Sequence, residues 1–178
     1  MAQPIHMKIS RPLMKPIAKM THFLTFSLGS DTYGIDILKI KEIKNFPDVV
    51  TPIAHSPAHI SGITHLDDVI VPIIDLCIYY HIEKENTSNP MMILLCLENK
   101  LIGLSVNSVF DIIGLTADQI KSAPDFCTIV NNIYINGVGI SNNNIILLLD
   151  VDKLLFSKDL QLMDASFNSF LTSEKVSP

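Results

Sequence analysis

Three histidines in the first half of the chain are the side chains best able to bind a metal ion. His55 and His59 are four positions apart, a spacing that would place two imidazoles on one face of a helix. Pro57 lies between them, and neither an H-E-x-x-H motif nor a cysteine is nearby. His65 is followed closely by two aspartates, which more often form a solvated turn. These residues leave a small-molecule-binding or metal-binding regulator open as a second hypothesis, while loop and surface histidines explain them equally well.

The three cysteines are the candidate nucleophiles. Cys77, Cys96 and Cys127 are far apart and follow no C-x-x-C pattern. Cys96 lies within the apolar run 92–97, where we expect a core thiol, whereas Cys77 and Cys127 lie at strand or loop ends and should be more open. A Cys–His pair stays open, because catalytic partners need not be neighbours in sequence. The chain has no glycine-rich phosphate loop and no G-x-S-x-G motif, so we predict neither an enzyme nor a cofactor.

Composition excludes several classes of protein. The 178 residues fit one domain or two small halves, and 48% hydrophobic with 17% charged residues argues against disorder for most of the chain. The apolar runs 69–74 and 91–97 are far shorter than the roughly 20 residues of a membrane-spanning helix. A net charge of −5 argues against binding of nucleic acid. An odd number of cysteines without a secretory signal predicts free thiols in the cytoplasm.

The first twenty positions are basic and contain no acid. They hold Lys8, Arg11, Lys15 and Lys19, together with three prolines, and lack the continuous apolar core of a signal peptide. We interpret residues 1–21 as a flexible basic tail. A weak attraction to acidic lipid or to an acidic partner is the alternative.

The elements that must position any site have the pattern of β-strands. Leu24, Phe26 and Leu28 alternate with polar residues, which is typical of a half-buried strand. Further strands are expected at 33–37, 60–63, 69–74, 91–97, 101–106, 109–113, 133–140 and 145–151, with a short extended or one-turn segment around 40–43. Pro72 cannot donate a ladder hydrogen bond and should place its strand at a sheet edge or bulge.

Helical signals are few. Thr116 and Gln119 match a capping box, which predicts a short helical turn that stops before Pro124. Apolar residues at helical spacing predict an amphipathic C-terminal helix over 151–170, with its apolar stripe packed on the body of the protein. A short tail, 171–178, follows.

The two halves of the chain, separated by a polar connector at 83–90, resemble each other. The segment 33–37 is echoed by 102–106, Gly62 by Gly137, and the aspartate after the strand 69–74 by the aspartate after the run ending at 149. Such a repeat of short strands indicates two similar small barrels that share an apolar interface.

A series of motifs resembles the CheW family of chemotaxis coupling proteins. The motifs run in family order from about residue 22 to 165 and consist of Phe23–Gly29, Tyr33–Ile43, Ile60–Thr64, Val69–Leu76, Leu115–Ile120, Ala123–Phe126 and Leu148–Leu155. The resemblance implies an all-β fold of two intertwined SH3-like five-stranded barrels with a shared hydrophobic core and a C-terminal helix. It implies one domain at 22–170, with half-barrels at roughly 22–82 and 91–151.

The resemblance also implies partners and contact residues. CheW-like proteins are adaptors without enzymatic activity that bridge the cytoplasmic tips of chemoreceptors and the regulatory domain of the histidine kinase CheA. Carried over by motif position, the kinase-binding residues would be Ile37, Glu42, Asp67, Lys121 and Phe126, and the receptor-binding residues would be Ile40, Ile43, Met91 and Ile112. Aliphatic side chains would supply affinity, and charges would select the partner.

The chain departs from the family pattern at one motif. The family usually has Asn-Leu-Arg-Gly where this chain has His65-Leu66-Asp67-Asp68, so the arginine position carries the opposite charge. The second aspartate replaces a glycine and could change the turn, because aspartate adopts left-handed backbone less readily than glycine. Asn107 stands where an aspartate is common.

From these features we predict a cytoplasmic adaptor of membrane-associated chemoreceptor arrays. A CheW-like scaffold for a different chemosensory or kinase pathway is the alternative within the same class. The sequence does not identify the receptor or the stimulus.

Overall fold

The computed structural model describes residues 17–84, 86, 89–123 and 134–156. Within this part of the chain the strands are β1 (Met20–Leu28), β2 (Asp31–Asp36), β3 (Ile40–Asn45), β4 (Ile60–Leu66), β5 (Val69–Asp75), β6 (Met91–Leu97), β7 (Lys100–Val106), β8 (Ser108–Thr116), β9 (Ile120–Ser122), β10 (Ile135–Ser141) and β11 (Asn144–Leu149). The helical elements are the 3-10 turns η1 (Ile37–Lys39) and η2 (Ala117–Gln119) and the short helices α1 (Leu76–Tyr79) and α2 (Val151–Leu155).

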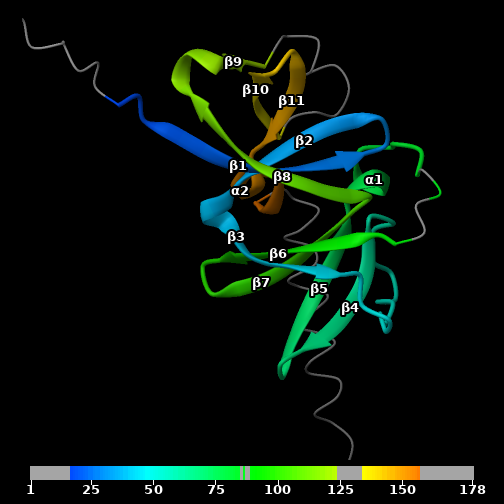
Figure 1. Ribbon diagram of the computed structural model, residues 1–178. Helices are drawn as coiled ribbons and strands as arrows, with labels where there is room; N and C mark the ends of the chain where they lie inside the picture. Colours follow the sequence, from blue (N-terminus) through cyan, green and yellow to red (C-terminus); the bar gives the residue numbers. More distant parts are fainter. Residues whose placement is uncertain (1–16, 85, 87–88, 124–133, 157–178) are drawn as a thin grey trace, which may run out of the picture.

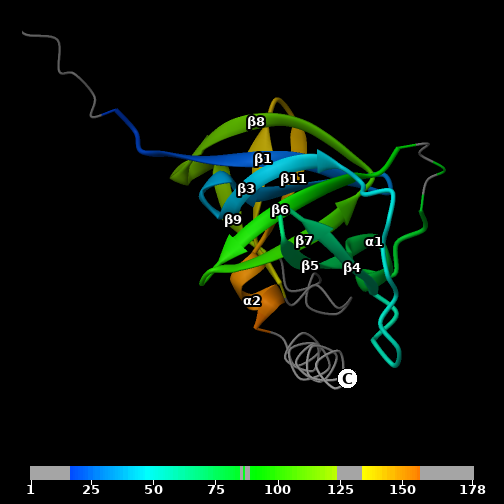
Figure 2. The same ribbon diagram turned by 90° about the horizontal axis from the view of Figure 1, so that it is seen from below.

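The strands form two sheets (Figure 1). One has six strands in the order β8-β1-β2-β11-β10-β9, and the other has five in the order β3-β6-β7-β5-β4. Figure 2 shows the same arrangement from below, with both sheets curled and α2 beside them. The element β1 begins at Met20, opposite Thr116 of β8, so the sheet starts two residues inside the segment predicted as a tail.

Each sheet contains strands from both of the sequence halves, 22–82 and 91–151. The six-stranded sheet joins β1 and β2 to β8–β11, and the five-stranded sheet joins β3–β5 to β6 and β7. The halves pair with each other at four places: the antiparallel pairs β1–β8 and β3–β6 and the parallel pairs β2–β11 and β5–β7. Parallel neighbours need a long crossover connection, so their partners come from distant sequence. The predicted intertwining is therefore present, with each half contributing to both sheets.

The internal repeat is a structural repeat. Gly34 lies opposite Leu148 in one parallel pair, and Gly103 lies opposite Ile73 in the other. Gly103 follows Gly34 by 69 positions, and Leu148 follows Ile73 by 75 positions. These are the two offsets at which the second half of the sequence repeats the first. The parallel pairs β2–β11 and β5–β7 are thus equivalent positions in one pseudo-symmetric fold.

The two short helices are also equivalent, and each begins at a capping aspartate. Asp75 Oδ1 accepts a hydrogen bond from Ile78 N (3.1 Å) at α1, and Asp150 Oδ1 accepts one from Lys153 N (3.0 Å) at α2. Of the predicted C-terminal helix, the structure describes α2, which ends at Leu155; the predicted segment from 157 onward lies outside the described residues.

One hydrophobic core lies between the sheets and joins them. It includes buried side chains of β1, β2, β5, β6, β7 and β11 as well as of both helices: Leu24, Phe26, Leu28, Tyr33, Ile35, Ile74, Leu76, Ile93, Leu95, Leu104, Leu149 and Leu154. Because strands of both sequence halves bury their apolar faces in this core, neither half can complete it alone.

The proline prediction for the strand 69–74 is wrong, because β5 is internal. Pro72 lies opposite Ile63, whose backbone N–H and C=O both bond to Thr51 on the other side. Pairing of β5 with β7 covers Ile73 to Asp75 and does not include Pro72. No ladder bond is therefore required from the nitrogen of Pro72, and an internal strand tolerates it.

Tyr80 provides a test of how the core is packed. Its side chain is buried and stacks on Tyr33 (ring centroids 5.9 Å apart), and its hydroxyl has no hydrogen-bond partner within the described residues. Burial raises the pKa of Tyr80 above its ordinary value. Since an unsatisfied buried hydroxyl costs about 1–3 kcal/mol, we expect Tyr80→Phe to increase the free energy of unfolding by about 1 kcal/mol.

Because the pKa of Tyr80 is raised, the stability difference between Tyr80→Phe and the wild type should depend on pH. The folded state retains the phenol proton, so the stability linked to it is present below about pH 10, the pKa of an unfolded tyrosine, and falls as pH rises above that value. The advantage of Tyr80→Phe over the wild type should therefore grow above about pH 10. Urea unfolding at neutral and alkaline pH measures both effects, and a variant less stable than the wild type at both would contradict the packing described.

Candidate partner-binding surfaces

The turn η1 and strand β3 carry four of the predicted contact residues. Ile37 and Ile40 are half-buried and pack against the core, whereas Ile43 is 38% exposed and Glu42 is exposed. Strand β3 is an edge strand and pairs with β6 alone in its sheet. Glu42 Oε2 lies 3.4 Å from Lys44 Nζ, an ion pair on the solvent face that contributes little to stability. This edge therefore presents an aliphatic side chain beside opposite charges.

The predicted receptor residue Ile112 lies on β8, which is the outer strand of the other sheet. Ile112 is 58% exposed, and Phe110, two residues earlier on the same strand, is 54% exposed. A shift in the register between β1 and β8 separates the two residues. Between them, Asp111 is held to β1, where Thr25 Oγ1 donates to Asp111 O (2.8 Å) and accepts from Asp111 N (3.3 Å). Sequence analysis missed Phe110.

Met91 begins β6 and pairs with Asn45 at the end of β3. It is half-buried and packs against the core. Met91, Ile40 and Ile43 therefore belong to one pair of strands in the five-stranded sheet, while Ile112 belongs to the six-stranded sheet, as the positions of β3, β6 and β8 in Figure 1 show.

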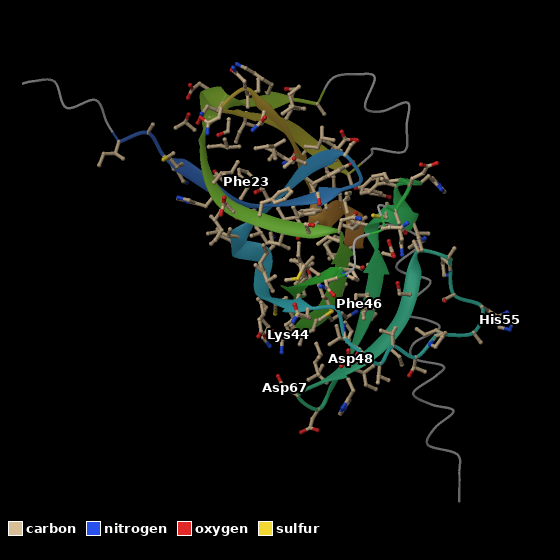
Figure 3. All side chains as sticks on the ribbon, turned by 45° about the vertical axis from the view of Figure 1, so that its right-hand side comes forward. Phe23, Lys44, Phe46, Asp48, His55 and Asp67 are labelled. Atoms are coloured by element: carbon tan, nitrogen blue, oxygen red, sulfur yellow. The ribbon has the colours of Figure 1, made fainter. Side chains whose placement is uncertain are left out.

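Asp67 lies at the tip of the hairpin that joins β4 to β5 (Figure 3). Asp67 and Asp68 are exposed and form a two-residue loop with φ values of 45° and 63°. Two positive φ values are those of a type I′ turn, which matches the twist of the flanking strands. The equivalent hairpin of the repeat has Asn142 and Asn143 at 49° and 63°. The turn predicted to change at Asp68 is therefore a regular hairpin turn, with a charged tip.

Lys121 lies on β9, the outer strand at the opposite end of the six-stranded sheet, and pairs with Val138. The preceding turn η2 confirms the predicted capping box, in which Gln119 Oε1 accepts from Thr116 N (3.0 Å). A hydrogen bond from Thr116 lowers the pKa of Asp118. The sequence did not reveal β9, which has three residues. Phe126, the other residue predicted for this surface, lies outside the described residues.

The predicted kinase-binding residues therefore fall into separate places. Ile37 and Glu42 lie on η1 and β3, Asp67 lies at the tip of the β4–β5 hairpin, and Lys121 lies on the other sheet. Glu42 on β3 and Asp67 on the β4–β5 hairpin belong to opposite edges of the five-stranded sheet, and Figure 3 shows Asp67 at the tip of its hairpin.

The histidines do not form a metal site. His55 projects from the loop before β4 (Figure 3), His65 is exposed on β4, and the ring of His59 packs edge-on against Tyr79 with centroids 4.9 Å apart. Within the described ranges no group of three or more His, Cys, Asp or Glu side chains could hold a metal ion.

The predicted exposures of two cysteines are reversed. Cys77 is buried, and its thiol donates to Asn107 Oδ1 (3.0 Å), which also accepts from Gly29 N (3.3 Å). Burial raises the pKa of Cys77, which opposes formation of a reactive thiolate. Cys96 is exposed, because alternation along β6 places its neighbour Leu95 in the core instead. Cys127 lies outside the described residues.

These features define a class of protein. Two interlocked SH3-like barrels bury one shared core and expose apolar side chains on outer strands, an arrangement that serves contacts between proteins. Among the described residues no helix is long and apolar enough to cross a membrane.

Comparison with known proteins identifies the family. The model of the CheW-like domain matches residues 22–159, and the chain belongs to this family. The chain is 41% identical over 143 residues to the chemotaxis protein CheW of Klebsiella aerogenes, covering 80% of this chain and 86% of the relative. It is 32% identical to the chemotaxis protein CheW of Treponema pallidum, covering 78% of this chain and 84% of the relative.

The fold has a solved counterpart. The crystal structure of the scaffolding protein TtCheW from Thermoanaerobacter tengcongensis matches 79% of this chain and 96% of its own length with a TM-score of 0.71 at 24% identity. The predicted all-β double-barrel fold is confirmed, and the two relatives above are named as chemotaxis proteins.

Proposed function

We propose that this chain couples the cytoplasmic tips of chemoreceptors to a CheA-type histidine kinase in the cytoplasm, at membrane-associated receptor arrays. The observation that carries the proposal is the exposure of large apolar side chains on the outer strands β3 and β8 of a family member that has no constellation for catalysis in its described residues. Ile43, Phe110 and Ile112 are 38%, 54% and 58% exposed. Apolar side chains at strand edges favour a protein partner, because covering them removes their area from water.

The receptor surface consists of Ile40, Ile43, Met91 and Ile112, to which the structure adds Phe110. A receptor tip built from helices would place its own apolar stripe against these aliphatic and aromatic side chains. The half-buried Ile40 and Met91 would contribute a fixed floor, because both pack on the core. The exposed Ile112 and Phe110 would supply most of the newly buried area.

The kinase-binding residues of this proposal are Ile37 and Glu42 on η1 and β3, Asp67 on the β4–β5 hairpin and Lys121 on β9, together with Phe126, which lies outside the described residues. Exposed charges at Glu42, Asp67 and Lys121 would select the partner and steer its approach. Asp67 favours a kinase whose facing surface is cationic, which supports the alternative that this scaffold serves a pathway with its own matched kinase.

The direct test measures binding of the full chain to each partner separately. Isothermal titration with the cognate CheA regulatory domain and with a receptor cytoplasmic fragment should yield saturable binding to both. Binding to neither would overturn the proposal, and binding to a non-cognate kinase domain alone would support the different-pathway alternative.

One substitution separates the two surfaces. We expect Ile112→Glu to weaken binding of the receptor fragment about tenfold or more, because a carboxylate would be desolvated where an aliphatic side chain is buried. Binding of the kinase domain should change less than about twofold, since Ile112 is not among the kinase-binding residues. Ile145→Glu, at a side chain 65% exposed on β11, is the matched control. Equal losses for the two variants would contradict the assignment of β8.

A further inference from the structure

The turn η1 holds an exposed leucine between anchored neighbours. Leu38 is 86% exposed, while Ile37 and Ile40 on either side of it pack against the core. Asp36 Oδ1 accepts a hydrogen bond from Leu38 N (2.9 Å), and Ile40 N donates to Ile37 O to close the turn. The backbone that carries Leu38 is therefore fixed on both sides, although its side chain makes almost no contact of its own.

An ion pair joins the same turn to the end of the fold. Lys39 Nζ lies 2.8 Å from Asp152 Oδ2 and 3.1 Å from Asp152 Oδ1, across 113 residues of sequence. Asp152 is held in place because Val151 and Leu154 of α2 are 3% and 0% exposed. The hydrogen bond that Lys39 Nζ donates to Asp152 raises the pKa of Lys39, which keeps the ammonium charged.

This ion pair lies where the chain crosses between the sheets. η1 connects β2 of the six-stranded sheet to β3 of the five-stranded sheet, and α2 follows β11 of the six-stranded sheet. A link between η1 and α2 therefore sets the position of the crossing turn relative to the sheet that it leaves. The pair is 37% and 45% exposed at its two side chains, so its energetic contribution is modest and its effect is on geometry.

A recess lies beside the turn. Its volume is about 320 Å³, and Phe23 and Leu148 line it together with Asp36, Lys39, Asp150 and Asp152. Three carboxylates against Lys39 give its rim an acidic character. A partner that buries Leu38 would bring its own side chains against this rim, and cationic groups would meet it favourably.

We propose that Leu38 is a central contact of the kinase-facing surface and that Lys39 and Asp152 are positioning residues that hold it ready for binding. The proposal rests on the proposed function, because Ile37 on the same turn belongs to that surface. The partner is a protein domain with an apolar pocket for one leucine and cationic side chains at its edge.

Fixed backbone distinguishes Leu38 from an ordinary exposed leucine. Single exposed apolar residues are common on protein surfaces. Association costs free energy for every flexible segment that it orders, so a leucine on a pre-fixed turn contributes more of its buried area to affinity. Side chains that dominate binding lie in well-packed pockets from which water is excluded, and a partner pocket that closes over Leu38 would provide such a place.

The test compares binding of the full chain to the cognate kinase regulatory domain across matched variants. Leu38→Ala should weaken binding about tenfold, whereas Ile17→Ala, at a residue 98% exposed ahead of β1, should change it less than about twofold. Lys39→Met should weaken binding about threefold, and Lys39→Arg should restore it, because arginine keeps the charge and can still reach Asp152.

Lys153→Met is the control for lost charge. Lys153 lies next to Asp152 on α2 and its ammonium is 3.8 Å from Asp150, so the variant removes a cation without touching the link to η1. Its kinase affinity should match the wild type. Melting temperature measured on every variant provides the readout for a merely structural role, which would move it together with affinity.

The outcomes separate this inference from the proposed function. Wild-type chain that binds neither kinase domain nor receptor fragment contradicts the proposed function itself. Wild-type chain that binds both, with Leu38→Ala binding the kinase domain normally, overturns only the role of Leu38. Equal losses for Lys39→Met and Lys153→Met would show that net charge matters and that the link does not.

Discussion

Asp67→Arg is expected to weaken binding of the cognate kinase regulatory domain about tenfold to a hundredfold, or about 1.4–2.7 kcal/mol. Asp67 is exposed at the tip of the β4–β5 hairpin, so a partner that approaches this hairpin would contact Asp67 early. If the facing surface is cationic, as the proposed function requires, the substitution replaces attraction by repulsion between like charges. The expected loss should lie mainly in the association rate and shrink as salt is added.

A neutral variant separates charge from backbone geometry in this experiment. Asp67 has a φ of 45°, a conformation that asparagine adopts about as readily as aspartate and arginine adopts less readily. Asp67→Asn should therefore preserve the turn and produce about half of the loss in binding free energy. Surface plasmon resonance at two salt concentrations measures both variants. Tighter binding by Asp67→Arg would mean that the partner presents an acid there.

Gly62→Ala is expected to lower the free energy of unfolding by about 3 kcal/mol or more. Gly62 has a φ of 141°, which L-residues rarely adopt, and a methyl group there would clash with the carbonyl oxygen of Thr51. The clashing atom belongs to the backbone and cannot move easily, because Thr51 N and O both form hydrogen bonds with Ile63. Relief requires the segment before β4 to separate from the sheet. Urea denaturation followed by circular dichroism measures the loss.

The repeat supplies the control for this prediction. Gly137 is the equivalent of Gly62, and each follows a register shift in its strand. A methyl group at Gly137 would lie 2.8 Å from Lys121 O, on the short strand β9. We expect Gly137→Ala to cost about 1–2 kcal/mol, because this overlap is smaller and an outer three-residue strand can shift. A larger cost at Gly137 than at Gly62 would contradict the reasoning.

Local patterns were enough to predict most strands. The element 91–97 is predicted at its observed bounds, and the alternation at Leu24, Phe26 and Leu28 places all three in the core, because a strand with one buried face must repeat with period two. The capping box at Thr116 was equally local, since its partners are three residues apart. Signals of this kind need no knowledge of the rest of the chain.

Long-range pairing was beyond these local patterns. The parallel pairs β2–β11 and β5–β7 join segments that are far apart in sequence, and no pattern within one half indicates its partner strand in the other. The position of Pro72 was predicted wrongly for a related reason. The backbone groups of Ile63, the residue opposite Pro72, form their hydrogen bonds with Thr51, so they need no hydrogen bond from Pro72. Cys96 was misread because a continuous apolar run hides which face is buried.

For the candidate surfaces as well, some residues could be predicted from local sequence, whereas others depend on contacts between distant segments. Motif position in the family resemblance suggested Ile43 and Ile112, and the exposed fractions of 38% and 58% are compatible with contact surfaces, although the partner roles stay predictions. Phe110 and Leu38 were missed because exposure of a large apolar residue depends on strand order and on neighbours from distant elements. The ion pair between Lys39 and Asp152 spans 113 residues and has no local signature.

The measurement that tests the central claim most directly is the rate of kinase autophosphorylation in a mixture of cognate CheA-type kinase, receptor fragment and this chain. A scaffold that binds both partners at once should raise the rate well above that of kinase and receptor without the chain, with the increase lost in the Ile112→Glu variant. An unchanged rate at concentrations where each binary complex is saturated would contradict the account.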